Sequence, residues 1–409
     1  MTVITRERQT QAQRALVIVF LIQGFVSAAI IPRVPDIIRN IDVSFAHWGV
    51  ISAFGTVGSA AGLFLANRVI ERFGVKHVAM VAFSVVGLGT GSFGWITNST
   101  IYFMVNFTVA VSMSIFVIAI NSQTVVLQTL SGRVIIGRFH AAWSAGAAFA
   151  AAVSGFLATL LPVGIHLFVF AAAGLTVFYL FARNLLDREE GLVAEGKAGD
   201  TTVGWRHMPK RVYLLGVGMA VGVFPEAAMW DWSSVYGRDA LGYDPTRAAI
   251  PYAFFAISMI VGRLLIDQIG KHIHISMQAA IGGTVSAIVM TVSVLIGPGL
   301  VAENPDGGLF IVGALWALAG LGTSAMTPSF LSSASIVSGM TAAAALTRMS
   351  VMQTTMIFVM KWLMGQTAES SGIGNAYWFP IGTWVIAVVI AVIVVRLSRR
   401  HHANQVSSN

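Results

Sequence analysis

The chain has 409 residues, of which 56% are hydrophobic and only 10% are charged, and its mean hydropathy is +0.78. Because an average water-soluble domain carries about 25% charged residues, this chain cannot cover a globular surface in water. The composition therefore excludes a cytoplasmic enzyme, a nucleic-acid-binding protein and a disordered scaffold as descriptions of the whole chain. The absence of cysteine also excludes disulfides, thiolate nucleophiles and cysteine metal sites.

Twelve apolar segments are predicted to span a membrane as helices. A helix needs about 20 apolar residues to cross about 30 Å of hydrocarbon, and lipid cannot satisfy an open backbone. The first half of the chain contains six predicted spans: 15–31, 45–69, 75–96, 101–130, 139–161 and 165–186. The second half contains six more: 212–234, 248–266, 275–297, 308–331, 342–364 and 377–395. The predicted fold class is an all-α membrane protein.

One extended polar stretch, residues 187–211, separates the two sets of spans. It mixes acidic and basic residues with spaced glycines, which is typical of a solvated linker. The predicted domains are an N-terminal six-helix bundle over 1–186, a cytoplasmic linker over 187–211, and a C-terminal six-helix bundle with a short cytoplasmic tail over 212–409.

The basic residues predict the orientation in the membrane. With the N-terminus inside, only five of the 25 lysines and arginines lie outside, namely Arg33, Arg39, Arg238, Arg247 and Lys361, and Arg348 lies within a span. Cytoplasmic loops of membrane proteins carry such an excess of positive charge. We therefore expect a multi-pass protein of the cell (inner) membrane with both termini cytoplasmic, and the net charge of +8 reflects this topology.

Two predicted cytoplasmic loops repeat the same pattern, one in each half. Residues 68–76 read R-V-I-E-R-F-G-V-K and residues 263–271 read R-L-L-I-D-Q-I-G-K. In both loops an acidic residue, Glu71 or Asp267, precedes a glycine by three positions, with a basic residue before and after. The pattern indicates two parallel six-helix repeats.

These loops resemble a motif of the major facilitator superfamily, G-x-L-A-D-R-x-G-R-K. Residues 71–76, E-R-F-G-V-K, match its second part with Glu in place of Asp, whereas Asn67 replaces the first Gly. The resemblance implies twelve transmembrane helices in two six-helix bundles. It also implies gating through charge pairs that form in only one access state, by Glu71, Arg72, Gly74, Lys76, Arg263 and Asp267. The alternative is that these residues are only topogenic charges and helix caps.

Other segments are similar to a bacterial subgroup related to fucose permease. They are A-I-N-S-Q at 119–123, G-R at 132–133, H-A-A-W-S-A-G at 140–146 and E-A-A-M-W-D-W-S at 226–233. The fifth predicted span lacks the G-x-x-x-G-P-x-x-G-G signature that drug/proton antiporters usually carry. This favours uptake of a solute over efflux.

Glu226 is the first candidate for a residue that carries transport. An ionisable side chain within a span is costly and marks function by default, and Pro225 before it favours a kink. We expect Glu226 to bind a proton or the solute. The alternative is a structural ion pair, for which Arg348 is a candidate partner. Asp231 lies nearer the outer surface, and His140 lies near the cytoplasmic end of its span.

Polar and aromatic residues extend this set. The resemblance implies that spans one, four, seven and ten line the transport cavity. Amide side chains suit hydroxyl-rich or heterocyclic solutes, although they also join helices, and tryptophans stack on rings or lie at membrane interfaces. The further candidates are Gln23, Asn106, Asn121, Gln123, Trp143 and Trp230.

The predicted function is secondary active transport of a small polar, sugar-like solute, coupled to protons, by alternating access. Drug or metabolite efflux by proton antiport is the second interpretation. A membrane enzyme or sensor without transport is the third, and it lacks a clustered catalytic or metal-binding set. The expected partners are the solute, protons and the lipid bilayer, with no nucleic acid, no cofactor and no metal, and the protein is expected to be a monomer.

Overall fold

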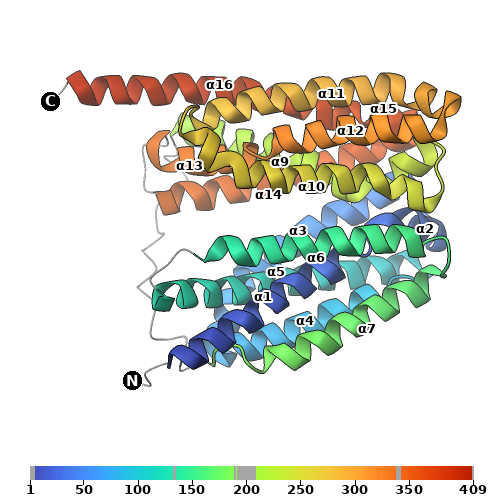
Figure 1. Ribbon diagram of the computed structural model, residues 1–409, viewed down its shortest axis with the longest axis horizontal. Coiled ribbons are helices and arrows are strands. Elements are labelled where there is room, and N and C mark those ends of the chain that lie inside the picture. Colours follow the sequence, from blue (N-terminus) through green and yellow to red (C-terminus); the bar gives the residue numbers. More distant parts are fainter. Residues whose placement is uncertain (1–4, 132–134, 188–189, 191–208, 338–341, 408–409) are drawn as a thin grey trace. The chain divides into compact units, whose positions relative to one another are not determined.

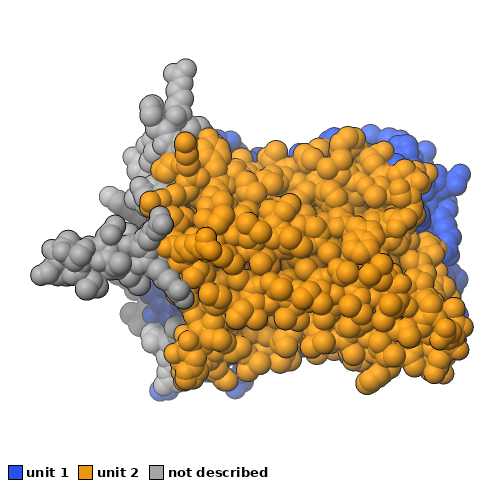
Figure 2. All heavy atoms as spheres, turned by 90° about the horizontal axis from the view of Figure 1, so that it is seen from above, with its two compact units in different colours: residues 1–198 blue, residues 199–409 orange. Residues whose placement is uncertain are grey.

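The computed structural model describes residues 5–131, 135–187, 190, 209–337 and 342–407. The chain divides into two compact units, residues 1–198 and 199–409 (Figure 2). Their boundary falls within the predicted linker 187–211, most of which lies outside the described residues. The described residues form helices and connecting turns and contain no strand (Figure 1).

Unit 1 consists of long helices joined by short connections. Helix α1 packs against α6 and α7, and α5 packs against α3 and α4. The elements are α1 (Arg6–Ala28), η1 (Ile31–Arg33), α2 (Val34–Asn40), α3 (Phe45–Phe73), α4 (Val75–Ser92), α5 (Ser99–Ser131), α6 (Ile136–Leu157) and α7 (Val163–Ala182).

Unit 2 has a similar composition of long helices. Helix α12 packs against both α10 and α11, and α9 packs against α14 and α16. The elements are α9 (Lys210–Val235), the π-helix η3 (Tyr236–Ala240), α10 (Pro245–Gly270), α11 (Ile275–Glu303), α12 (Pro305–Thr323), α13 (Met326–Val337), α14 (Ala342–Ser371), α15 (Ile373–Ala376) and α16 (Trp378–Ser407).

Glycines allow pairs of helices to approach each other closely. A Cβ atom at Gly24 of α1 would collide with the carbonyl oxygen of Trp143 of α6, and one at Gly146 of α6 would collide with that of Leu21. Lipid tails are as apolar as the helices, so the hydrophobic effect does not drive helices together within a membrane. Small residues allow the backbones to approach closely, and van der Waals packing then holds the helices together. The Gly-Ala-rich sequence of α6 therefore allows this helix to pack closely against α1.

Ten described stretches are long and apolar enough to cross a membrane, and they include every long helix except α6 and α14. These two helices have 22 and 30 residues, so their length suits a span. Their composition is less apolar because α6 is rich in alanine and glycine, and α14 carries Arg348, Gln353 and Lys361. The protein is an all-α membrane protein of the predicted class.

The two segments predicted as cytoplasmic loops are largely helical, so the predicted helix ends were wrong by several residues. Helix α3 continues to Phe73 and α4 begins at Val75, which leaves only Gly74, with φ 80°, as the turn. Helix α10 continues to Gly270. Arginine and glutamate are good helix formers, so hydrogen bonding along the helix continues where the apolar pattern stops.

Candidate functional site

An ion pair joins two helices of unit 2. The Arg263 guanidinium of α10 donates to both carboxylate oxygens of Glu226 of α9, at 3.0 and 3.2 Å. Both residues lie in stretches apolar enough to cross a membrane. The structure therefore pairs Glu226 with Arg263 rather than with Arg348. Arg263 lies three residues before the end of the apolar stretch Pro245–Ile266.

This pair is partly open. The exposed fraction is 37% for the Arg263 side chain and 34% for that of Glu226. Pro225 precedes Glu226 inside α9 and has no backbone N–H to donate, so the helix lacks one of its hydrogen bonds next to the carboxylate. Because the pair is accessible and the adjacent helical turn is weakened, Glu226 and Arg263 can each exchange the other for another hydrogen-bond partner.

Aromatic side chains lie beside the pair. Trp230 follows Glu226 by one helical turn and contacts Tyr252 of α10 edge to face, with ring centroids 6.2 Å apart. Tyr252 is buried, whereas Trp230 is half-buried. A half-buried indole near a charged pair offers both an apolar face and a polar edge to a small molecule.

A second ion pair joins α9 to α14. Asp231 accepts from the ammonium group of Lys361 at 2.8 Å, and each side chain is only 15% exposed. Asp231, next to Trp230, is thus less accessible than Glu226. The sequence prediction counted Lys361 among the outer charges and did not pair it with Asp231.

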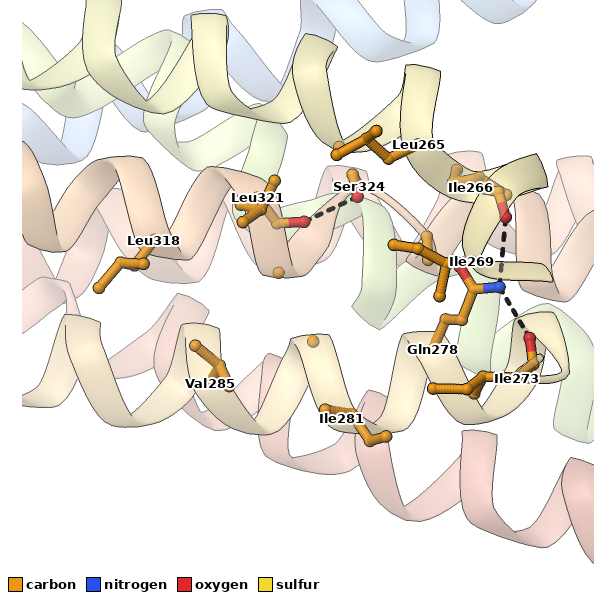
Figure 3. Close-up of a pocket in the computed structure, with 14 residues that line it drawn as sticks. Leu265, Ile266, Ile269, Ile273, Gln278, Ile281, Val285, Leu318, Leu321 and Ser324 are labelled. Carbon is orange, nitrogen blue, oxygen red and sulfur yellow. Dashed lines mark hydrogen bonds between the residues drawn. The ribbon is translucent and has the colours of Figure 1, made fainter. Parts of the chain in front are cut away.

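Figure 3 shows an apolar cavity of about 270 Å³ among α10, α11 and α12. Its polar side chains are satisfied by backbone: Gln278 donates to the carbonyls of Ile266 and Ile273, and Ser324 donates to that of Leu321. The walls are mainly aliphatic, as Leu265, Ile269, Ile281, Val285 and Leu318 illustrate. This lining suits hydrocarbon rather than a polar solute.

The amide candidates of unit 1 bond mainly to their own bundle. The Gln123 side chain donates to the Leu186 carbonyl and accepts from the Leu186 amide, both at 3.0 Å, and is buried. Asn121 donates to the Val117 carbonyl of its own helix. We therefore leave Gln123 out of the proposed site, because its side chain joins the end of α7 to α5.

The remaining unit 1 candidates differ in exposure. Gln23 is buried and lies 3.8 Å from the Met113 sulfur, while Asn106 donates to the Ile51 carbonyl at 3.4 Å. His140 is exposed and contacts the Phe20 ring edge to face, and Trp143 is half-buried. The structure places these residues in one unit, on α1, α5 and α6.

Four of the six residues predicted to gate, Glu71, Arg72, Gly74 and Lys76, lie where α3 meets α4. Glu71 and Arg72 are exposed at the end of α3. Lys76 at the start of α4 pairs with Asp187 at 3.0 Å and donates to the Arg183 carbonyl at 2.7 Å. Asp267 lies in α10, and its side chain is outside the described structure.

Sequence reasoning missed a buried polar cluster in unit 1. Arg33, 2% exposed, donates to the His166 ring nitrogen Nδ1 at 3.0 Å, to Asp36 at 2.9 Å and to the Ala158 carbonyl at 3.0 Å. It also donates to the Leu161 carbonyl. The signal was present, because His166 is an ionisable residue within a predicted span, but Arg33 was treated as an outer loop charge.

Residues 16–344 match the model of the Major Facilitator Superfamily. This chain belongs to that family. An uncharacterized MFS-type transporter of Yersinia pestis is 26% identical over 324 residues, which is 77% of this chain and 78% of the relative. An uncharacterized transporter of Sinorhizobium fredii is 25% identical over 252 residues, 61% of this chain and 65% of the relative.

Solved structures show the major facilitator fold at low sequence identity. A mutant of the nucleoside transporter NupG matches with a TM-score of 0.74 and 13% identity, over 95% of this chain and 99% of that chain. The D-xylose–proton symporter matches with a TM-score of 0.71 and 14% identity, over 95% and 97%. These likenesses concern the fold.

Membership of the major facilitator family, together with the long apolar helices, indicates a multi-pass membrane transporter. In the part of the chain that the structure describes, no three or more His, Asp or Glu side chains are grouped to hold a metal ion.

Proposed function

We propose that this protein is a proton-coupled secondary transporter of a small polar solute and that the Glu226–Arg263 pair couples the two. The observation that carries the proposal is an ion pair within two spans, each side chain of which is about one-third exposed. An ion pair whose open part faced hydrocarbon would be costly. We therefore infer that the pair opens to a water-filled path.

Protonation changes what Arg263 can bind. While Glu226 is ionised, its two oxygens accept from the guanidinium. A proton that binds a carboxylate oxygen removes the negative charge and weakens the pair, whereas arginine keeps its charge throughout. Arg263 then needs another acceptor, and a hydroxyl or carbonyl oxygen of the solute supplies it. Release of the proton restores the pair and displaces the solute, so the proton and the solute are transported together.

The neighbouring groups favour a hydroxylated or heterocyclic solute. Trp230 offers an apolar ring face within a turn of Glu226, and the resemblance of 140–146 and 226–233 to the fucose-permease-related subgroup supports a sugar-like substrate. The other residues that we propose for this pathway are Asp231, His140, Trp143, Gln23, Asn106 and Asn121.

The proposal extends to topology and gating. Both termini are cytoplasmic in the inner membrane, the protein acts as a monomer, and charges at the ends of α3 and α10 differ in pairing between access states. Efflux by proton antiport is the second candidate, and the 17 methionines favour it because they suit a plastic apolar pocket. The same ion pair would then exchange a proton for the exported compound.

The test uses protein in proteoliposomes with a trapped pH-sensitive dye and a panel of neutral monosaccharides and nucleosides. Compounds of the panel that raise the melting temperature of the purified protein are then added outside the liposomes. We expect the lumen to become acidic with wild-type protein, because protons enter with the compound, and not with Glu226→Gln. The variant retains exchange of the compound, since an amide resembles a protonated carboxyl.

Two controls separate function from folding. Asp306→Asn removes an 82% exposed carboxylate outside the pair and should leave acidification unchanged. The double variant Glu226→Gln/Arg263→Gln removes both charges together, so no unpaired charge is left. If that double variant restores solute-dependent acidification, the pair is only structural and the coupling proposal is wrong.

A further inference from the structure

A small pocket lies where α1 meets the start of α6 in unit 1, with a volume of about 210 Å³. Its α1 residues follow the spacing of a single helix face. The lining residues that matter here are Thr10, Gln13, Arg14 and Val17 of α1 and Arg138 and Phe139 of α6. The pocket is lined by two arginines and no acidic residue.

The two arginines have no partner among the described residues. Arg14 and Arg138 are both exposed, and no hydrogen bond or ion pair of either side chain is found there. Arg8, two turns before Arg14, is the contrast: it pairs with Glu190 at 2.7 Å and donates to the carbonyls of Asn184 and Leu185. The same helix thus holds one arginine bound to acceptors and one that lines the pocket.

The start of α6 adds positive potential. Its N-cap residue, Ile135, provides no side-chain cap, and its first turn contains no acidic residue. Helix N-termini favour negative groups, so Arg138 in this first turn is electrostatically unfavourable on its own. An anion in the pocket would compensate the arginines and the helix end together.

We propose that this pocket binds a phosphoryl anion. Its volume is below the roughly 300–1,000 Å³ of drug-sized ligand sites, which suits a small anionic group. Guanidinium groups match phosphate oxygens in pairs, and the Gln13 amide supplies further donors. The ligand is either the headgroup of an anionic phospholipid or a free phosphate compound from solution.

The position of the pocket suits either source. Arg14 directly precedes the apolar run that begins at Ala15, so the pocket lies at the level of lipid headgroups. Val17 and Phe139 form an apolar side on which a glycerol unit could rest. An anion bound there joins α1 to α6 and stabilises unit 1 by mass action.

The experiment measures the melting temperature of the full-length protein in nanodiscs. One series compares phosphatidylcholine discs with discs containing phosphatidylglycerol, and the other adds inorganic phosphate to phosphatidylcholine discs at constant ionic strength. We expect at least one of the two anions to stabilise wild type. The apparent affinity should fall about fivefold for each arginine replaced by glutamine.

The variants are Arg14→Gln, Arg138→Gln and their combination, with Arg6→Gln as the control, because Arg6 is exposed on α1 outside the pocket. Arg138→Glu guards against misfolding, since an acid suits a first turn and the variant should fold and lose the response. Stabilisation by phosphatidylglycerol alone identifies a lipid headgroup, and stabilisation by phosphate identifies a free anion. The proposal fails if wild type responds to neither, or if the double variant or Arg138→Glu responds like Arg6→Gln.

Discussion

Both units contain an arginine bound to an acidic residue, but the two sites differ in access. Arg33 of unit 1 is 2% exposed and bonds to Asp36, His166 and two backbone carbonyls. Arg263 of unit 2 bonds to Glu226, and 37% of its side chain is exposed. A charge that is closed off on all sides cannot exchange partners, whereas an open pair can.

This difference in access assigns a structural role to Arg33 and a functional role to Arg263. In unit 1 the guanidinium satisfies carbonyls that the end of α6 leaves without helical donors. In unit 2 the guanidinium serves one carboxylate, which protonation can neutralise. We therefore expect substitutions in unit 1 to lower stability, and substitutions of the open pair to change transport with less effect on stability.

The largest effect on stability is expected at Arg33. Arg33→Met removes the 2.9 Å ion pair to Asp36 and the donors to two carbonyls, which costs about 3–5 kcal/mol for a buried pair. The measurement is thermal unfolding in detergent. Arg39→Met is the matched control, because Arg39 is 61% exposed and lies 4.0 Å from the same aspartate. Equal losses in the two variants would contradict the structural role.

A smaller loss is expected at Asp231. Asp231→Asn weakens the 2.8 Å bond to Lys361, and hydrogen bonds to charged groups are worth about 1.5–3 kcal/mol. Thermal unfolding of Asp231→Asn, Lys361→Gln and the double variant forms a cycle that isolates the coupling. If the two single losses simply add in the double variant, the pair contributes nothing to stability.

Much of the fold follows from the sequence. The apolar runs predict long membrane helices with a break at 187–211, because every backbone polar group in hydrocarbon must be bonded within the protein. The uneven distribution of lysine and arginine supports the same division into spans. Helix ends were predicted less well. Gly74, with positive φ, was the only marker of the turn after α3, and the charged residues around it continue helices instead of forming a loop.

The candidate site was predicted in part. Glu226 was identified from the cost of a charge within a span, but its partner lies 37 residues away, and only tertiary packing of α9 on α10 selects Arg263 over Arg348. Gln123 had the same sequence signal as Asn121, yet it bonds to Leu186, four residues after the end of α7. A single sequence cannot tell which polar side chains find partners inside the bundle.

The Tyr243 hydroxyl, which lies outside the candidate membrane spans, joins the connection between η3 and α10 to the start of α12. It donates to the Pro305 carbonyl at 2.9 Å, so Tyr243→Phe should cost about 0.5–1.5 kcal/mol. Burial, with Asp306 nearby, raises the pKa of Tyr243 above its ordinary value of 10.0, against the effect of Arg247. Because the folded pKa is raised, the contribution is present below pH 10 and lost as pH rises through the folded pKa. The stability difference between wild type and Tyr243→Phe should be constant at neutral pH and shrink in strong alkali.

The smallest stability change is expected at the open pair, and it tests the comparison most directly. Glu226→Gln removes an ion pair that is more than one-third exposed on its arginine side, so its cost should be about 1 kcal/mol or less, well below that of Arg33→Met. Because the chain has no cysteine, single cysteines also report access. A membrane-impermeant thiol reagent should label Glu226→Cys and leave Ser154→Cys unlabelled, since Ser154 is fully buried against the Ala29 carbonyl in unit 1. Absence of labelling at Glu226→Cys, with rapid labelling at Ser154→Cys, would contradict the comparison, because the Glu226–Arg263 pair would then be closed to water.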